Sequence, residues 1–432
     1  MSRRSVISLF SGAMGLDLGL IQAGYQIRTL VEIDRFAVDT IRQNRPSIQL
    51  MQRCGFGLVD RPIESVPTSE LLEIAELDAG EVELVVGGPC CQAFSTAGQR
   101  GSLVDDRGSL FREFLRVVHE AQPRFFVMEN VRGVLSAAIK HRPLAERGPA
   151  FPPLRPSEEL GSAFKKIVDE LAETGYHISF DLVNTADYGV PQTRERVIIL
   201  GSRDGNPVST PKPTHGRDSR SNPWVNLRVV LDELAGLPRT HTDLCQSKRR
   251  YLSLVPAGGN WRDLPARLQR EALGGAFDSW GGRVGFFRRL AWDRPSPALT
   301  TRPDSKATML CHPTELRPLA VEEYAAIQQF PKWWKFAGGI PQKYKQIGNA
   351  VPVGLGRAIG CELQLAKRRR PNQELCGIVR CANEALLTRM ANRPRTILNP
   401  VRMRPDSDPD AAAAWTQKRG RSRKSYLTAV ST

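Results

Sequence analysis

The stretch Ser5–Ile21 (SVISLFSGAMGLDLGLI) decides the fold class of this chain. Its first part, Ser5–Phe10, is rich in β-branched and apolar side chains and predicts a buried strand. The glycines of Ser11–Gly15 predict a turn, and the apolar spacing after them predicts a helix. A strand, a glycine turn and a helix form the first crossover of a doubly wound α/β sheet, where glycine lets a ligand approach the backbone.

The alternation of strands and helices continues to about residue 202. A second strand is expected at 27–31 and ends in Glu32, and an acidic residue at that point is the usual partner of ribose hydroxyls. Residues 141–157, which are rich in proline, predict a surface loop. Further strands are expected at 84–86, 125–128, 178–183 and 197–201, and helices at 67–77, 110–120 and 160–175.

Two adjacent cysteines follow the strand expected at 84–86. The stretch Gly87–Ser95 (GGPCCQAFS) predicts a loop at the carboxyl end of that strand, where open α/β sheets place their reactive groups. Two buried structural cysteines are an equally good interpretation of these residues alone.

The charge of the chain indicates a polyanionic partner. The 432 residues carry a net charge of +16, with a hydrophobic content of 41% that is typical of a globular protein. Nucleic acid is the leading candidate, because counterion release drives that association. Residues 366–432 hold 15 lysines and arginines against 5 acidic residues, and from about residue 404 the composition predicts disorder.

The eight cysteines show no zinc-ligand spacing, so no metal site is expected, and we infer a reducing, cytosolic location. Arg3-Arg4 resembles an export signal, but the apolar run after it is short. No stretch approaches the length needed to span a membrane.

Residues 202–316 lack the regular alternation of the first part. Between residues 203 and 294 there are 16 lysines and arginines against 9 acidic residues. The aromatic residues among them predict either the core of a small domain with solvated charge around it or, as the favoured interpretation, a surface for nucleic acid. They are Trp224, Trp261, Trp280, Phe286, Phe287 and Trp292.

Helical periodicity returns at 321–328. A helix opened by 344–352 is expected to run to residue 365, with a helical extension over 366–392.

Taken in order, six segments resemble the DNA (cytosine-5)-methyltransferase family, in its compact prokaryotic, restriction-modification form. The resemblance covers residues 5–202 and about 290–360, and six segments in the family's order make coincidence very improbable. They are Phe10–Gly15, Glu32, Gly88–Ser95, Glu129–Val131, Gln192–Arg196 and Gln346–Pro352.

The resemblance implies a catalytic set. Cys91 is the implied nucleophile, adding to C6 of cytosine so that C5 can accept a methyl group. Glu129 is the implied donor to N3, a role that requires a protonated carboxyl and hence a pKa raised by burial. Arg194 and Arg196 would hold the carbonyl oxygen of the base and order the catalytic loop.

The resemblance also implies S-adenosylmethionine as the methyl donor. Residues of the glycine turn are expected on one side of its pocket and residues of the last segment on the other, so that the last segment would complete the first domain. The implied cofactor-binding residues are Phe10, Gly12, Gly15, Glu32, Ile33, Asp60, Pro89, Leu110, Asn349 and Val351.

Three residues depart from the family's pattern. Cys90 stands where the family usually has proline, and Cys91 is assigned to catalysis because Gln92–Ser95 follows it in the family's register. Asp60 is only the nearest candidate for the acidic residue that binds the adenine amine. Met14 replaces a common glycine and is tolerated if its side chain points away from the cofactor.

The expected organisation is an S-adenosylmethionine-dependent α/β domain with an inserted recognition domain. The catalytic domain is predicted at 1–202 and 317–365, and the target-recognition domain, which would bind double-stranded DNA around a flipped cytosine, at 203–316. A C-terminal extension is predicted at 366–403 and a basic tail at 404–432. The first motif begins so early that no N-terminal regulatory domain is expected.

A cognate restriction endonuclease acting on the same site, without a stable complex, is the partner suggested by this compact organisation. Two rival functions are a tRNA cytosine-5 methyltransferase on the same scaffold and a catalytically inactive DNA-binding relative. The first is disfavoured because its branch of the family carries a Cys-Phe-Thr tripeptide in the recognition region, and the sequence contains none. The second is supported only by Cys90.

Overall fold

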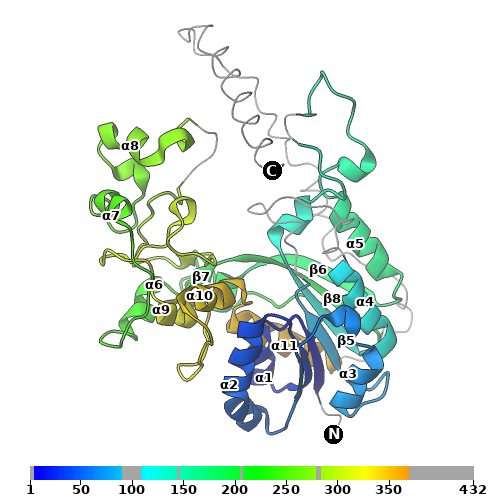
Figure 1. Cartoon of the computed structure of the whole chain (residues 1–432). Coiled ribbons are helices and arrows are strands. Elements are labelled where there is room, and N and C mark those ends of the chain that lie inside the picture. Colours follow the sequence, from blue (N-terminus) through cyan, green and yellow to red (C-terminus); the bar gives the residue numbers. More distant parts are fainter. Residues whose placement is uncertain (1–3, 90–108, 144–145, 205–207, 279–283, 369–432) are drawn as a thin grey trace, which may run out of the picture. The chain divides into compact units, whose positions relative to one another are not determined.

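A seven-stranded sheet is the framework of the N-terminal half of the chain (Figure 1). The computed structural model describes residues 4–89, 109–143, 146–204, 208–278 and 284–368. The strand order is β3-β2-β1-β4-β5-β8-β6. The strands are β1 (Ser5–Leu9), β2 (Gln26–Val31), β3 (Gly57–Val59), β4 (Leu84–Gly87), β5 (Phe125–Val131), β6 (His177–Asn184) and β8 (Glu195–Ser202).

The directions of the strands confirm the predicted doubly wound sheet. Strands β1 to β5 pair in parallel, and β8 runs antiparallel to both of its neighbours, β5 and β6. Strand β1 pairs with β2 on one side and with β4 on the other, so the strand order reverses there. Open α/β sheets bind their ligands outside the carboxyl ends of the strands at such a point.

Helices flank the sheet, and most of them lie where the sequence predicts them. The 18-residue helix α2 is the exception, because Pro46 inside it hides the helical pattern. The side chain of Asp34 caps this helix by accepting hydrogen bonds from the N–H groups of Phe36 and Ala37. The helices of this half are α1 (Gly15–Gln22), α2 (Arg35–Gln52), α3 (Thr68–Ala75), α4 (Ser109–Ala121) and α5 (Ser162–Ala172).

The chain returns at its C-terminal end to pack against its own first helix. Helix α11 (Val353–Lys367) approaches α1 so closely that glycine is required on both helices. A Cβ atom on Gly19 would lie 2.3 Å from the carbonyl oxygen of Val353, and one on Gly356 would lie 2.5 Å from that of Leu16. Any side chain at these positions would therefore force the two helices apart.

Some of the described residues between 244 and 316 form a second hydrophobic core, which includes several of the aromatic residues there. Trp261 and Phe287 are buried in this core, and Phe287 stacks edge-on against Tyr251. Trp261 packs likewise against Phe277. At least these rings provide core packing, because so small a core needs large apolar side chains to exclude water. Trp280 lies outside the described residues.

The remaining short strands and helices lie in the chain between β6 and α11. Two-residue strands β7 (Gln192–Thr193) and β9 (Ser296–Pro297) pair in parallel. The helices are α6 (Leu227–Asp232), α7 (Gln246–Leu252), α8 (Ala266–Leu273), α9 (Val321–Ile327) and α10 (Ile340–Asn349).

The segment 344–352 ends one helix and precedes another, instead of opening a single helix as predicted. The helix α10 stops at Asn349, because Pro352 has no N–H to continue it, and α11 begins after that proline. The predicted extension over 366–403 and the tail at 404–432 lie outside the described residues, apart from the end of α11.

Within the described ranges, no helix is both long enough and apolar enough to cross a lipid bilayer. The same ranges hold no group of three or more histidine, cysteine, aspartate or glutamate side chains that could bind a metal ion.

Candidate active site

The carboxylate of Glu32 holds the turn after β1. Glu32 is buried at the end of β2 and accepts hydrogen bonds from the backbone N–H of Gly12 at 2.6 Å and of Asp34 at 2.7 Å. Burial raises the pKa of Glu32, and the two hydrogen bonds oppose that shift. Gly12 has a φ of +54°, and a Cβ atom there would meet no atom of the described residues within 4 Å. The turn therefore presents bare backbone to open space, as close approach of a ligand requires.

Three more of the predicted cofactor residues follow the ends of strands β1 to β3. Phe10 comes directly after β1 and has a left-handed backbone, with φ of 56°. Ile33 follows Glu32 and is 62% exposed. Asp60 follows β3, and its carboxylate pairs with Arg42 of α2 at 2.6 Å. The parallel pairing of these strands brings the three residues to one edge of the sheet.

Other predicted residues come from later parts of the chain. Pro89 is buried after β4, and Leu110 is half-buried in the first turn of α4. Asn349 is the exposed last residue of α10. Lys345 of the same helix pairs with Asp34 at 2.6 Å, so the end of α10 lies near the end of β2.

Gly15 has a packing role that the sequence did not indicate. A Cβ atom on Gly15 would lie 2.1 Å from the carbonyl oxygen of Val351. The absence of a side chain at Gly15 is therefore required by the segment that precedes α11, whether or not a ligand also approaches it. A direct contact of Gly15 with the cofactor stays a prediction.

Asp17, in the first turn of α1, was missed by sequence reasoning. Its side chain is 1% exposed and is hydrogen-bonded to Ser8, but its Oδ1 has no hydrogen-bond partner within the described part of the chain. Burial raises the pKa of Asp17 to about 7, the bond to Ser8 opposes this shift, and the charge of Glu32 adds to it. An acidic residue in the first turn of a helix is usually interpreted as a favourable partner of the helix dipole, so its burial could not be predicted from the sequence.

Glu129 and Arg196 form an ion pair where β5 pairs with β8. The Nε atom of Arg196 lies 2.5 Å from Oε1 of Glu129, and the two side chains are 11% and 12% exposed. A Cβ atom on Gly88 would lie 3.0 Å from Oε2 of Glu129, so the carboxylate stands beside the end of β4. Cys90, Cys91 and the rest of that loop lie outside the described residues.

Arg194 lies within reach of the charges of both members of this pair, but its described hydrogen bonds go to backbone carbonyls. Its buried guanidinium donates to the carbonyl oxygen of Leu299 at 2.9 Å and to that of Gly348 at 2.7 Å. Burial lowers the pKa of Arg194, and the neighbouring charge of Arg196 lowers it further. Arg194 therefore links the strand pair β7 and β9 to the end of α10. This structural contact of Arg194 was not predicted from the sequence.

Gln192 binds the same backbone segment as Arg194 and was not predicted to do so. Its Oε1 accepts from the N–H of Leu299 at 2.9 Å, and its Nε2 donates to Gln328 at 3.0 Å. Gln328 in turn donates to the carbonyl oxygens of Ile347 and Ala350. Gln192 and Arg194 thus both position the backbone around the last motif.

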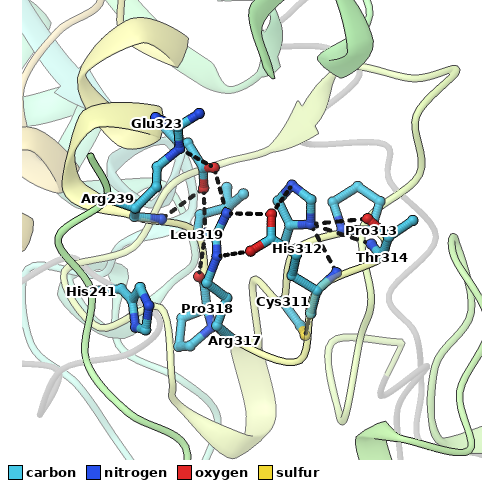
Figure 2. A network of polar contacts seen from close by, with 12 residues as sticks. Arg239, His241, Cys311, His312, Pro313, Thr314, Arg317, Pro318, Leu319 and Glu323 are labelled. Carbon is cyan, nitrogen blue, oxygen red and sulfur yellow. Dashed lines mark hydrogen bonds and ion pairs between the residues drawn. The ribbon is translucent and has the colours of Figure 1, made fainter. Parts of the chain in front are cut away.

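A network of buried ion pairs lies at the start of α9 (Figure 2). Arg317 donates to both carboxylate oxygens of Glu323 at 2.8 Å, and Arg239 donates to Glu323 at 3.2 Å. Arg317 also donates to Glu315 at 2.8 and 3.1 Å. Burial alone would raise the pKa of Glu323, but the hydrogen bonds and charge of Arg317 outweigh it and hold the pKa below its usual value. His312, beside this network, accepts the N–H of Glu315 at Nδ1.

The class of the protein follows from the sheet and the turn together. The S-adenosylmethionine-dependent methyltransferase fold has this strand order, with β8 antiparallel to its neighbours. It also has this glycine turn, which accepts support from an acidic residue at the end of β2.

The profile of the C-5 cytosine-specific DNA methylase family matches residues 4–365, and the chain belongs to that family. It is therefore a DNA (cytosine-5-)-methyltransferase, as the sequence motifs indicate, and the family implies S-adenosylmethionine as methyl donor and DNA as substrate.

Its similar proteins include bacterial type II methyltransferases. M.PspPI of a Psychrobacter species is 38% identical over 82% of this chain and 78% of its own length. M.Sau96I of Staphylococcus aureus is 34% identical over 83% of this chain and 75% of its own length. A crystal structure of a DNA modification methyltransferase encoded within an Escherichia coli prophage shares the fold. Its TM-score is 0.55 at 22% identity, over 84% of this chain and 99% of that one.

Proposed function

We propose that this enzyme methylates C5 of a cytosine flipped out of double-stranded DNA, through a covalent bond between Cys91 and C6. The ion pair between Glu129 and Arg196 is the observation that carries the proposal. It brings a carboxyl group and a fixed cation to the strand end that leads into Cys91. Addition at C6 is needed because C5 by itself is too weak a nucleophile to accept a methyl group.

In the proposed reaction, the Cys91 thiolate forms a bond to C6, and the electron pair of the C5–C6 double bond moves onto the ring. Glu129 stabilises that charge by donating a hydrogen bond or a proton to N3. Arg196 orients Glu129 and binds the carbonyl oxygen of the base. After C5 has accepted the methyl group, loss of the C5 proton to a base expels the Cys91 thiolate and restores the aromatic ring.

The residues around the glycine turn suit S-adenosylmethionine, which would supply an electrophilic methyl group. A carboxylate has about four acceptor positions, so Glu32 can bind ribose hydroxyls in addition to the two N–H groups that it already holds. Asp60, at the end of the next strand, offers an acceptor for the adenine amine. The bare backbone of Gly12 and the exposed amide of Asn349 complete the proposed pocket.

Arg194 acts in this proposal as a positioning residue. Its guanidinium is buried, and two of its nitrogens donate to backbone carbonyls at residues 299 and 348, so that it would shape the pocket from behind rather than touch the base.

We also propose that residues 203–316 bind DNA and select the site, as a domain between the two parts of the catalytic domain, 1–202 and 317–365. Arginines stack against aromatic rings of this region: Arg262 lies 5.5 Å from the ring centre of Trp261, and Arg250 lies 5.4 Å from that of Tyr251. Such stacking orders the long side chains, and an ordered guanidinium loses less entropy on binding a phosphate.

The proposed cellular role is protective methylation in a type II restriction-modification system. The resemblance to M.PspPI and M.Sau96I supports it, since both are named as type II methyltransferases. An endonuclease acting on the same DNA site would be the functional partner, without a stable complex. DNA from cells that express the enzyme should resist that endonuclease, and sequencing its methylated cytosines would identify the site.

Covalent trapping on duplex DNA that contains 5-fluorocytosine tests the mechanism. Fluorine at C5 cannot leave as a proton does, so the wild-type enzyme should stay bound to the DNA after methyl transfer. Cys91→Ser should form no adduct, whereas Cys90→Ser should form it. The reverse pattern would assign the nucleophile to Cys90. Labelled methyl donor offered with duplex DNA or with tRNA should label the DNA only.

A further inference from the structure

Asp17 is a buried carboxyl that the roles proposed above leave unused. It lies at the third position of α1, directly after the glycine turn. Side chains on a helix lean toward its N-terminus, so the carboxyl of Asp17 leans back toward the turn. Ser8, near the end of β1, is hydrogen-bonded to Asp17, and the Oγ atoms of Ser8 and Ser11 lie 3.0 Å apart. Three polar side chains thus meet beneath the turn that would hold the methyl donor.

The surroundings of Asp17 call for a cation. Its Oδ1 is buried and has no hydrogen-bond partner within the described part of the chain. The described ionisable group that acts on it is Glu32, which is itself acidic. A buried carboxyl with an unused acceptor is costly, and it is retained most readily where a ligand completes it.

We propose that Asp17 binds the α-ammonium group of the methionine part of S-adenosylmethionine. The inference rests on the proposed function, since it takes S-adenosylmethionine as the methyl donor. The donor carries two cationic groups, and only the ammonium has N–H bonds that an aspartate oxygen can accept; the sulfonium has none. Asp17 is therefore a positioning residue, which fixes the methionine end of the donor while Glu32 fixes the ribose.

Calorimetric titration of the full chain with two ligands tests this role. One ligand is S-adenosylhomocysteine, and the other is its analogue without the amino group, 5′-S-(3-carboxypropyl)-5′-thioadenosine. Asp17→Asn should weaken S-adenosylhomocysteine about 10- to 100-fold, the range expected for a hydrogen bond to a charged group, and should leave the analogue within about threefold. In the wild type, the analogue should itself bind about 10- to 100-fold more weakly than S-adenosylhomocysteine.

Glu83→Gln is the matched control. Glu83 is another buried carboxylate, but it lies at the start of β4, at the opposite end of the strands, and pairs there with Lys367. Its loss should change neither affinity. The proposal is overturned if Asp17→Asn weakens both ligands equally, which would mean a structural role, or weakens neither. A wild type that binds neither ligand would instead refute S-adenosylmethionine as the donor, and with it the proposed function.

Discussion

Two carboxylates with the same exposure have opposite environments in this enzyme. Glu323, in the network at the start of α9, and Asp17, beneath the glycine turn, are each 1% exposed. Glu323 receives hydrogen bonds from two arginines, and its pKa is held below the usual value. Asp17 has a serine as its partner and an acidic neighbour, and burial raises its pKa to about 7.

The difference separates a group that stabilises the fold from one that is ready for a ligand. The charge of Glu323 is compensated within the chain, so nothing remains for a ligand to supply. The charge of Asp17 is not compensated by the described residues, so its ionised form destabilises the free enzyme and would be stabilised by a bound cation. Burial alone does not distinguish the two roles; the partners of each carboxylate do.

The largest effect is expected from breaking the compensated pair. Glu323→Gln should lower the free energy of unfolding by about 3–5 kcal/mol, because it leaves Arg317 and Arg239 without their shared anion. Urea denaturation at pH 7.5 measures this loss. The double variant Arg317→Met and Glu323→Leu removes both buried charges and should recover at least half of it. A double variant as unstable as the single one would mean that packing, and not charge, dominates the network.

Asp17→Asn should have the opposite effect on the free enzyme. In the folded protein Asp17 keeps its proton up to a pH of about 7, whereas its ordinary pKa is 3.8. The folded state therefore binds more protons in this window, and stability falls as the pH rises through it. The shift of about three pKa units corresponds to about 4 kcal/mol at about 1.4 kcal/mol per unit, so we expect Asn to raise the free energy of unfolding by up to about 4 kcal/mol at pH 8.

This gain should shrink as the pH is lowered from 7 toward 4, and it should vanish below the ordinary pKa of 3.8, where Asp17 is protonated in both states. Chemical denaturation of both variants without cofactor, at several pH values, provides the comparison. An Asp17→Asn variant that is less stable than the wild type at pH 8 would show that other groups in the protein compensate the charge of the Asp17 carboxylate.

The pH dependence of cofactor affinity is expected to be somewhat smaller. If Asp17 must ionise to bind an ammonium group, S-adenosylhomocysteine should bind the wild type about tenfold more weakly at pH 6 than at pH 8, since a group with a pKa of about 7 loses about a factor of ten one unit below it. Glu32 also has a raised pKa and can add to this dependence. Asp17→Asn keeps the contribution of Glu32, so the difference between the two profiles isolates Asp17. Identical profiles would contradict the proposal.

The sheet could be predicted from the sequence because its strands are fully buried. The strands β2, β4 and β5 are short, largely apolar runs that end at or next to a glycine or an acidic residue, and the ends of β2 and β5 place Glu32 and Glu129 at the carboxyl edge. Helix α2 escaped prediction because Pro46 interrupts its pattern.

Contacts across long sequence separations could not be predicted. Arg194 binds backbone carbonyls 105 and 154 residues away, and nothing in its local sequence distinguishes it from Arg196, which pairs with Glu129 instead. The close approach of α11, which arrives from the far end of the chain, to Gly19 of α1 could not be predicted for the same reason. The catalytic cysteine loop was predicted in detail but lies outside the described residues, so Cys91 remains a prediction.

The smallest effect is expected at Glu315, which contacts the same guanidinium as Glu323 but is largely in water. Its carboxylate accepts from Arg317 at 2.8 and 3.1 Å, and its side chain is 58% exposed. The hydrogen bonds from Arg317 lower the pKa of Glu315, so its contribution to stability is present above the ordinary pKa of 4.5 and is lost as the pH falls below it.

Glu315→Gln makes the same chemical change as Glu323→Gln on the same partner. It should cost less than about 1 kcal/mol, and high salt should reduce that further, because water and ions already screen the exposed pair. Urea denaturation of the two variants side by side decides whether burial sets the strength of each pair. Equal losses would show that Arg317 needs both carboxylates alike.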